Sequence, residues 1–373
     1  MKLCYIANPN SVHTRRWLNW FASRGHKVSL IADTPLLEPW PAIQVYDLPA
    51  RLNLKIVRFF PWTVWSKQIL QELEPDVLHA HRVNSAGWLS VFTGFHPMVV
   101  TPWGTDLYQL PNQSFTARWL ATYVLKNADF VTADSQDLIQ QAIKYGANPG
   151  ISEVIQWGVD LKIFFPADKN PELQKRLKVG NHPVLLSPRA VKPIYNLETI
   201  IKAIPEVRRD LPETIFIFRD YNTDPNYKDR LLMLIDRLGV RESVRWFGEL
   251  ERWEECVEIY RLADIIISVP ISDGTPVSVL ESMACGIPVI ASDLPSLREW
   301  IKNGENGILV PTRDEQVLAD AIIKLLKDAN KRADIRNRNI DLIRLRANPQ
   351  IEMEKMETIY NFLQDRRQVN TRG

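Results

Sequence analysis

The stretch ISDGTPVSVLESMACGIPVIASD, residues 271–293, decides the fold. It follows the apolar run 263–270, which predicts a buried strand that ends at an Asp-Gly turn. Thr275 suits a helix N-cap, Pro276 the first helical position and Gly286 the end of the helix. The segment is therefore predicted to form a strand, a tight turn, a short helix and a second strand, as in a parallel α/β sheet.

This arrangement places a helix N-terminus at the carboxyl end of a parallel strand, where free backbone N–H groups attract phosphate. Two carboxylates frame that place, Asp273 on the turn and Glu281 on the helix. A carboxylate can accept two hydrogen bonds from the neighbouring hydroxyls of a ribose or hexose ring. The pattern predicts a nucleotide-sugar site. The alternative is that Asp273 is an ordinary turn residue and Glu281 a solvated helical acid.

Size and composition bound the class of protein. The chain has 373 residues, 45% of them hydrophobic, which is enough for two packed domains. A net charge of +2, from 46 basic and 44 acidic side chains, gives no reason to expect nucleic acid as a partner. The N-terminus predicts a strand rather than a signal peptide, and no run resembles a membrane span. Cys4, Cys256 and Cys285 are widely spaced, so we expect reduced thiols in a soluble cytoplasmic protein.

Strand-like and helical segments alternate along the chain in two series. We expect strands at 3–7, 27–32, 77–81, 98–103 and 130–133, then at 184–187, 214–219, 244–247, 263–269, 288–291 and 307–310. Helices are expected over 14–22 and near 195–209, 226–238, 252–261, 277–285 and 314–328. This alternation predicts two doubly wound α/β domains, residues 1–165 and 166–349. Met353, Met356, Ile359, Tyr360 and Leu363 recur at helical spacing, which predicts a final amphipathic helix.

The loop after the first strand, NPNSVHTRR at 8–16, contains no glycine. A nicotinamide-dependent dehydrogenase needs GxGxxG at this place, so the loop argues against that class of enzyme. Ser11 and His13, with Arg15 or Arg16, are candidates for contact with phosphate or with an acceptor. The alternative is that they are solvated residues at a helix start.

Two cations follow the strand VLLS, Arg189 and Lys192. A departing nucleoside diphosphate develops negative charge, and fixed cations aimed at it lower the barrier. Arg189 is therefore the main candidate for stabilising a leaving group, with a surface ion pair as the alternative. No acidic pair that could bind a metal ends a strand in a suitable context, so we expect no metal site.

A second group of candidates lies in the first half of the chain. His79 and His81 end one strand, Trp103 and Asp106 follow the next, and both strand ends are expected at the same edge of the sheet. Asp106 could orient or deprotonate an acceptor hydroxyl. A histidine at a strand end is at least as often a packing residue, so Asp106 is the stronger candidate.

The segment RLNLKIVRFFPWTVWSKQ, residues 51–68, mixes basic and aromatic side chains. Such a mixture can hold a protein at an anionic membrane surface or bind a lipid-linked or sugar acceptor. A peripheral position at the inner membrane face is therefore one hypothesis. The alternative is an ordinary helix and loop with inward-facing aromatics.

Taken together, these motifs resemble glycosyltransferase family four, the retaining enzymes of GT-B fold. DGTPVSVLESMACGIPVIASDLPSLREWIKNGENGILV, residues 273–310, is similar to the donor-site signature of that family. SPRAVKPIYN, residues 187–196, resembles its phosphate-binding segment, and WGVDLKIFFP, residues 157–166, its interdomain linker. The resemblance covers essentially the whole chain.

The resemblance implies two Rossmann-like domains facing each other across a cleft, with the final helix, 350–373, returning to the first domain. It implies transfer of a sugar from a UDP- or GDP-sugar to a hydroxyl of a glycan, lipid-linked or small-molecule acceptor, with anomeric retention and without a metal or other cofactor. The leaving phosphate would accept the acceptor's proton, so no enzymic nucleophile is required.

The resemblance also assigns roles to residues. Glu281 would bind the ribose hydroxyls, Asp273 the hydroxyls of the transferred sugar, and Arg189 the diphosphate. The contacts with sugar and diphosphate would come from Gly274, Thr275, Pro276 and Val277, and those near the base from Phe247, Gly248 and Leu250.

The chain departs from the family pattern in five places, one of which is the loop at 8–16, which lacks the usual glycines. Asp273 replaces the commoner glutamate, Ile194 replaces a lysine for which Lys192 could substitute, FRDYN at 218–222 replaces a glycine pair, and Trp103 replaces a frequent histidine. These departures leave two other hypotheses open: a catalytically silent nucleotide-sugar-binding protein and a nucleotide-sugar epimerase of the same fold.

Overall fold

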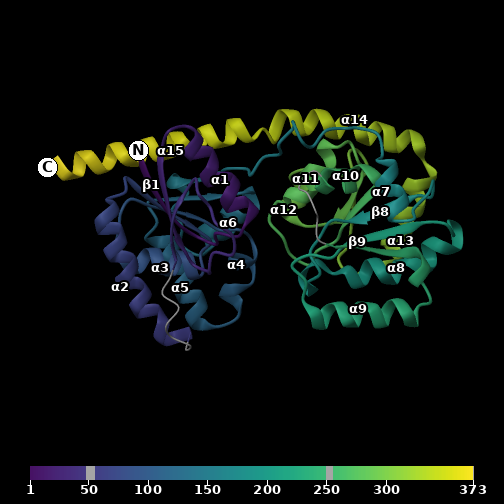
Figure 1. Ribbon diagram of the computed structural model, residues 1–373, viewed down its shortest axis with the longest axis horizontal. Coiled ribbons are helices and arrows are strands. Elements are labelled where there is room, and N and C mark those ends of the chain that lie inside the picture. The colour runs from purple at the N-terminus through teal and green to yellow at the C-terminus, as the bar shows by residue number, and fades with distance from the viewer. Residues whose placement is uncertain (48–54, 249–254, 373) are drawn as a thin grey trace. The chain divides into compact units, whose positions relative to one another are not determined.

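The computed structural model describes residues 1–47, 55–248 and 255–372. The chain divides into two compact units, Met1–Trp157 with Gln350–Gly373, and Gly158–Pro349 (Figure 1). Residues 158–165, which the sequence suggested as the end of the first domain, lie in the second unit.

The first unit is built on a parallel sheet of seven strands in the order β3-β2-β1-β4-β5-β6-β7. The strands are β1 Lys2–Ala7, β2 Lys27–Ala32, β3 Gln44–Asp47, β4 Val77–His81, β5 Met98–Thr101, β6 Phe130–Ala133 and β7 Ser152–Val154. The helices are α1 Val12–Ser23, α2 Lys55–Leu73, α3 Ser85–Thr93, α4 Thr105–Tyr108, α5 Phe115–Lys126, α6 Gln136–Lys144 and α15 Pro349–Arg372, with short 3-10 turns η1 Leu110–Asn112 and η2 Pro149–Ile151.

The second unit repeats this design with six parallel strands in the order β10-β9-β8-β11-β12-β13. The strands are β8 Val184–Ser187, β9 Ile215–Arg219, β10 Val244–Phe247, β11 Ile265–Ser268, β12 Val289–Ser292 and β13 Ile308–Val310. The helices are α7 Pro171–Arg176, α8 Leu197–Asp210, α9 Pro225–Arg237, α10 Glu255–Leu262, α11 Val277–Ala284, α12 Pro295–Arg298, α13 Glu315–Lys327 and α14 Ala329–Arg346, with 3-10 turns η3 Pro193–Tyr195 and η4 Arg241–Ser243.

Each sheet therefore reverses its strand order once, between β1 and β4 in the first unit and between β8 and β11 in the second. In an open parallel sheet the loops at the carboxyl ends of the strands separate at such a reversal, and ligands bind there. The predicted doubly wound α/β architecture is confirmed for both units. Each sheet is buried on both faces by apolar side chains of its helices.

The last helix, α15, completes the core of the first unit. Its apolar residues pack with Tyr5, Trp17 and Phe21 over one face of the first sheet; they are Met353, Met356, Ile359, Tyr360 and Leu363. The amphipathic helix expected from the spacing of these five residues is confirmed, and every one of them is buried.

A buried polar network fixes α15 to the sheet. The Tyr360 hydroxyl is hydrogen-bonded to His79 Nδ1 (2.5 Å) and to the Tyr5 hydroxyl (3.0 Å). His79 Nε2 is hydrogen-bonded in turn to Thr101 Oγ1 (2.6 Å). Burial, and then the neighbouring His81, lower the pKa of His79 well below its usual value, so the imidazole stays neutral. His79 therefore positions a helix and is not part of a binding edge.

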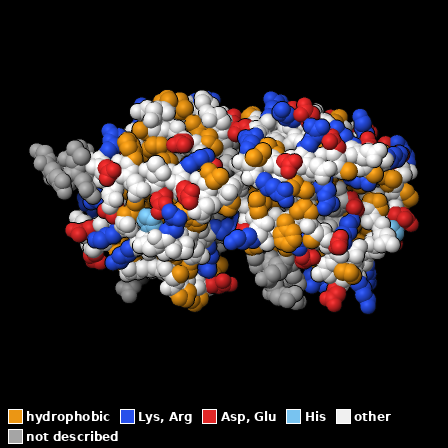
Figure 2. Space-filling view, turned by 90° about the horizontal axis from the view of Figure 1, so that it is seen from above, with side chains coloured by type: hydrophobic (Ala, Val, Ile, Leu, Met, Phe, Trp, Pro, Cys, Tyr) orange, Lys and Arg blue, Asp and Glu red, His pale blue; other side chains and the backbone are white. Residues whose placement is uncertain are grey.

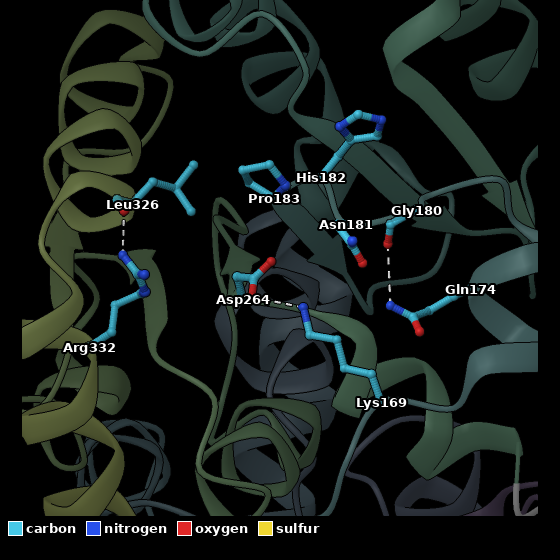
Figure 3. A pocket seen from close by; sticks show the side chains of 9 residues that line it. All are labelled: Lys169, Gln174, Gly180, Asn181, His182, Pro183, Asp264, Leu326 and Arg332. Carbon is cyan, nitrogen blue, oxygen red and sulfur yellow. Dashed lines mark hydrogen bonds and ion pairs between the residues drawn. The ribbon is translucent and has the colours of Figure 1, made fainter.

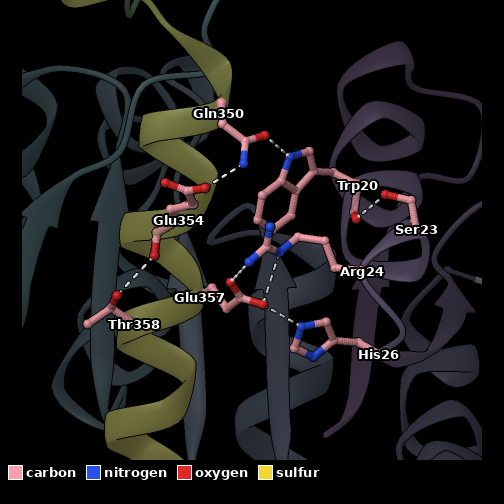
Figure 4. A network of polar contacts seen from close by, with 8 residues as sticks. All are labelled: Trp20, Ser23, Arg24, His26, Gln350, Glu354, Glu357 and Thr358. Atoms are coloured by element: carbon pink, nitrogen blue, oxygen red, sulfur yellow. Dashed lines mark hydrogen bonds and ion pairs between the residues drawn. The ribbon is translucent and has the colours of Figure 1, made fainter.

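A second set of polar contacts lies at the rim of this interface. Figure 4 shows Arg24 and His26, just after α1, converging on Glu357 of α15. His26 Nε2 lies 2.7 Å from a Glu357 oxygen, and Trp20 Nε1 donates to Gln350 Oε1 (3.2 Å). An apolar centre with a paired polar rim is the arrangement of a permanent helix contact.

Charge is distributed evenly over the face shown in Figure 2. Lys and Arg side chains are interspersed there with Asp and Glu side chains, without an extended area of one sign. In the described part of the chain, no helix is both long and apolar enough to cross a bilayer. Cys4, Cys256 and Cys285 are buried free thiols.

Candidate active site

The reversal of the second sheet brings two loops together at its carboxyl edge. Arg189 follows β8 and Asp273 follows β11, and Arg189 Nη2 donates to Asp273 Oδ2 over 2.5 Å. Arg189 Nη1 also donates to Ser278 Oγ in the first turn of α11 (3.1 Å), and its guanidinium lies over the Tyr195 ring, 4.2 Å from the centroid. Burial raises the pKa of Asp273 above its usual value although Arg189 opposes the shift. The edge therefore holds one nearly buried cation and one nearly buried acid in direct contact.

The second predicted acid lies one turn into α11. Glu281 is buried, and the Tyr260 hydroxyl of α10 donates to its Oε2 (3.1 Å). Ser278, which accepts from Arg189, lies three residues before Glu281 on the same helix. Asp273, Arg189, Tyr260 and Glu281 thus form one continuous cluster, so the structure places the two acids in the same neighbourhood.

The turn before α11 differs from the expected cap. The helix starts at Val277, with Pro276 in the N-cap position and no side-chain cap, so the prediction of Thr275 as N-cap is wrong. The Thr275 hydroxyl instead accepts a hydrogen bond from Trp300 Nε1 (3.4 Å). Gly274, Thr275, Pro276 and Val277 are all buried, and the free N–H groups of the first helical turn remain at the sheet edge.

The remaining donor-side candidates lie along the same edge. Lys192 precedes η3, is half-buried, and forms no ion pair with any described residue. Phe247 ends β10, and Gly248 follows it with open space beside its Cα. Leu250 lies outside the described residues.

The carboxyl edge of the first sheet carries an aromatic cluster. His81 ends β4 and pairs in register with Thr101 of β5, so the expectation that both strand ends meet at one edge is confirmed. His81 packs against Trp103 (centroids 5.6 Å apart) and Trp157 (6.1 Å), and Trp103 packs against His13 (5.9 Å).

His81 is unusual in this cluster because both ring nitrogens are buried and neither has a hydrogen-bond partner in the described part of the chain. Burial, with smaller contributions from Arg82 and His13, lowers the pKa of His81 to about 3, so the ring is neutral. Trp103 Nε1 is likewise buried without a partner. Ser11 occupies the N-cap position of α1, near the same edge, and its side chain forms no cap hydrogen bond.

Asp106 has a different environment from the one its sequence position suggested. Its side chain is buried. Oδ2 accepts a hydrogen bond from the Val83 amide (2.7 Å), and Oδ1 accepts one from the Trp103 amide (2.9 Å). Burial raises the pKa of Asp106, and these two amides act against the shift. Because both oxygens already hold the loops after β4 and β5 together, the geometry favours positioning of Trp103 over direct contact with an acceptor hydroxyl.

A cavity of about 270 Å³ lies elsewhere on the second unit (Figure 3). Pro183 and Asp264, which line it, directly precede β8 and β11, so the cavity is at the amino edge of the sheet, opposite the Arg189 cluster. The ion pair between Lys169 and Asp264 (2.8 Å) spans it. In the described ranges, no group of three or more His, Cys, Asp or Glu side chains could hold a metal ion.

Several residues of the cluster were not predicted from the sequence. Tyr260 is remote in the chain from Glu281, and Ser278 and Tyr195 lie within predicted motifs without having been assigned a role. The helical register of α11, which puts Ser278 and Glu281 on one face, could have identified Ser278.

Glycosyltransferase family models match both halves of the chain. The model of glycosyl transferases group 1 matches residues 168–341, and that of glycosyl transferase 4-like proteins matches residues 2–135. N-acetyl-alpha-D-glucosaminyl L-malate synthase of Bacillus anthracis is 22% identical over 353 residues, 91% of this chain and 90% of that protein. The D-inositol 3-phosphate glycosyltransferase 2 of Catenulispora acidiphila is 25% identical over 322 residues, 79% of this chain and 72% of that protein.

Solved structures share the fold over nearly the full length. Anabaena Alr3699/HepE in complex with UDP and glucose superposes with a TM-score of 0.80 at 19% identity, covering 97% of this chain and 100% of that one. Sucrose-phosphate synthase from Thermosynechococcus elongatus has a TM-score of 0.83 at 19% identity, covering 97% and 99%. With two parallel α/β units of the GT-B type, a group 1 model matching its second half and a 4-like model matching its first, the chain is a glycosyltransferase similar to those of family four.

Proposed function

We propose that this glycosyltransferase moves a sugar from a UDP- or GDP-sugar to an acceptor hydroxyl with retention at the anomeric carbon and without a metal ion. The observation that carries the proposal is the cluster of Arg189, Asp273, Tyr260 and Glu281 at the strand reversal of the second sheet. It combines a cation for a diphosphate with two acids for hydroxyl groups. The complex of the structurally similar HepE with UDP supports a nucleotide-sugar donor.

The donor would be held by groups that already lie at this edge. Arg189 would bind the diphosphate together with the free N–H groups at the start of α11, and Lys192 would add a second charge within reach of the same loop. Glu281 would accept from the ribose hydroxyls, and Phe247, Gly248 and Leu250 would lie near the base. Gly274, Thr275, Pro276 and Val277 would face the sugar and the diphosphate.

The ion pair between Arg189 and Asp273 would have to open when the donor binds. A bound diphosphate competes with Asp273 for the Arg189 guanidinium, because both are anions. Once the diphosphate takes that contact, Asp273 can accept hydrogen bonds from the sugar hydroxyls. In the transfer step the bond from the anomeric carbon to the diphosphate oxygen breaks, and a bond from that carbon to the acceptor oxygen forms on the same face. The acceptor's proton passes to the departing phosphate oxygen.

The acceptor would use the aromatic cluster of the first unit. His13, His81 and Trp103 bring aromatic rings together at the carboxyl edge of that sheet, near Ser11. The ring nitrogens of His81 and Trp103 have no hydrogen-bond partner among the described residues. Aromatic faces with a few polar groups suit a sugar or another polyhydroxylated acceptor. Asp106 would act as a positioning residue that fixes Trp103.

Donor binding and turnover test the proposal in two steps. A thermal-shift panel of UDP-, GDP- and ADP-sugars should show stabilisation by one base, because a ligand that binds the native state raises its stability. Product formed with that donor and a panel of glycan, lipid-linked and small acceptors, with the anomeric configuration read by NMR, should show retention. EDTA should leave the rate unchanged.

Other outcomes select the alternatives. Binding without turnover on every acceptor indicates a silent nucleotide-sugar-binding protein, for which the absent lysine at Ile194 would be the reason. An epimeric nucleotide sugar formed without any acceptor indicates an epimerase. Inversion at the anomeric carbon contradicts the proposed mechanism.

For a lipid-linked acceptor, we propose that the protein binds peripherally to an anionic membrane surface. The stretch 51–68 that suggested it lies partly outside the described residues, but Phe60 on α2 is 77% exposed. Phe115, Trp119 and Tyr123 form an exposed stripe on α5, and neither α3 nor α5 contains an acidic residue. Arg118 and Lys126 supply positive charge on α5, so this surface combines aromatic and basic groups as a lipid interface requires.

A further inference from the structure

Arg219 occupies a central place at the carboxyl edge of the second sheet. It is the last residue of β9, which lies between β8 and β10. Phe218 pairs in register with Ser187 of β8, and Arg219 itself pairs with Phe247 of β10. Arg219 is therefore flanked by the loop that carries Arg189 and by the segment proposed to lie near the base. In the sequence, Arg219 belongs to FRDYN at 218–222, the stretch that stands where the family has a glycine pair.

The charge of Arg219 has no acidic partner among the described residues. Its Nη1 donates to Cys256 Sγ (3.4 Å), a weak acceptor, and its Nε is buried without a partner. The adjacent acid, Asp220, forms its ion pair with Lys228 instead. A half-buried guanidinium is stabilised when an anion repays its desolvation, and none of the described acidic side chains does so here. Arg189, by contrast, has Asp273.

Tyr221 connects Arg219 with the Arg189 loop. The Arg219 guanidinium lies over the Tyr221 ring, 4.4 Å from the centroid, and the Tyr221 hydroxyl donates to the Pro188 carbonyl (3.4 Å). Tyr221 therefore links the Arg219 guanidinium to the loop after β8, which carries Arg189.

The order of the strands gives Arg219 a position relative to a bound donor. Along the edge run Asp273 after β11, Arg189 after β8, Arg219 at the end of β9, and Phe247 at the end of β10. With the transferred sugar at Asp273 and the base near Phe247, a nucleoside diphosphate must pass Arg189 and then Arg219. We propose that Arg219 is a second cationic contact for the donor, that it binds the phosphate next to the ribose, and that it takes the place of the lysine absent at Ile194.

This inference rests on the proposed function, and a comparison of UDP, UMP and uridine tests it. Affinities are measured by calorimetry for the wild type, Arg219→Met and Lys192→Met. Arg219→Met should weaken UDP and UMP by about 10-fold or more, as expected for loss of a hydrogen bond between charged groups, and change uridine less than about 2-fold. Lys192→Met should weaken UDP less than Arg219→Met does.

Equal losses for UDP and uridine, or UDP affinity unchanged by Arg219→Met, overturn the inference. Arg241→Met is the matched control, since Arg241 is an exposed arginine paired with Asp236. Melting temperatures check the fold, and Arg219→Gln, which retains a polar head group, replaces the methionine variant if that variant does not fold. A wild-type protein that binds none of UDP, GDP and ADP contradicts the proposed function itself, and the role of Arg219 with it.

Discussion

Arg189 and Asp273 form a nearly buried ion pair across the strand reversal of the second sheet. The atoms Nη2 and Oδ2 are 2.5 Å apart, and the two side chains are only 9% and 17% exposed. Asp273 thus occupies the contact with Arg189 that the proposed mechanism gives to a diphosphate. The pair neutralises a nearly buried cation.

Asp273→Asn should therefore separate binding from turnover. UDP should bind as tightly as to the wild type or several-fold tighter, because the competing carboxylate charge is gone, while transfer falls by about 100-fold through loss of contacts to the sugar. The free variant should melt at a lower temperature, and UDP should restore the difference. Asp293→Asn, which breaks the exposed pair with Arg298, is the control and should change neither quantity. Weaker UDP binding in Asp273→Asn would argue against the competition.

Glu281→Ala should lower kcat/KM by about 100-fold, because a carboxylate that accepts two ribose hydroxyls contributes two charge-assisted hydrogen bonds. Tyr260→Phe should have a smaller effect, since Tyr260 only orients the carboxylate through its 3.1 Å hydrogen bond. Comparison of UDP with 2′-deoxy-UDP adds a direct readout. The wild type should prefer UDP, and Glu281→Ala should bind both alike. A preference that persists in the variant would place the ribose elsewhere.

The buried network of Tyr360 makes a prediction for stability. Tyr360→Phe removes the hydroxyl shared by His79 and Tyr5 and leaves polar groups unpaired in the core, which should cost about 1–3 kcal/mol. Phe362→Ser on the same helix, at a side chain 45% exposed, should cost much less. Urea unfolding of both variants measures the difference. Equal midpoints for Tyr360→Phe and the wild type would mean that the network adds nothing.

Glu357 of α15 should make the stability of the fold depend on pH, through its contacts with Arg24 and His26. Partial burial acts to raise the pKa of Glu357, but the hydrogen bonds from Arg24 and His26 outweigh it, and the pKa is lowered from its usual value near 4.5. A carboxyl with a lowered folded-state pKa stabilises the fold above its unfolded pKa, and this contribution is lost as the pH falls through the folded value.

Glu357→Gln should therefore lower the unfolding midpoint at pH 7, and the difference from the wild type should shrink as the pH falls below about 4.5. Urea titrations at a series of pH values between 7 and 3 measure it. A difference that does not depend on pH would mean that Glu357 acts through packing and not through its charge.

The exposed stripe on α5 gives the test of membrane contact. The triple variant Phe115→Ser, Trp119→Ser, Tyr123→Ser should lose co-sedimentation with vesicles that contain anionic lipid, because aromatic side chains supply the apolar part of interfacial binding. Wild-type binding should weaken with added salt and on purely zwitterionic vesicles. The variant Met233→Ser, Leu345→Ser, at exposed apolar side chains of the second unit, is the control. A wild-type protein that does not bind anionic vesicles contradicts the proposed contact.

The pattern of apolar runs predicted most of both sheets, because buried parallel strands are short and apolar throughout. Strands at 27–32, 77–81, 130–133, 184–187 and 244–247 have the bounds expected. β3 and β7 were missed because each is short and only partly buried. α14 was missed because it is polar on nearly all sides and buries few residues, among them Ile335 and Ile343.

The sequence predicted individual residues of the candidate site but not the contacts between them. Arg189, Asp273 and Glu281 were identified because each follows a strand or lies in the helix after it, and strand order alone brings them to one edge. The pairing of Arg189 with Asp273 and the contact of Tyr260 with Glu281 join distant segments, so no local pattern encodes them. For Asp106 the local pattern was misleading. Its place after a strand suggested a general base, but both of its carboxylate oxygens accept hydrogen bonds from backbone amides.

The place of α15 in the core of the first unit has a consequence for biosynthesis. Its apolar residues fill one face of a sheet whose strands are translated more than 190 residues earlier, since the whole second unit, Gly158–Pro349, intervenes. In a ribosome-bound nascent chain, Tyr5, Trp17 and Phe21 therefore lack their α15 partners until that helix has been made, whereas the second unit can close its core beforehand. The N-terminal half should consequently depend on chaperones longer than the C-terminal half, and a stop codon near residue 348 should yield an aggregating product rather than a shorter enzyme.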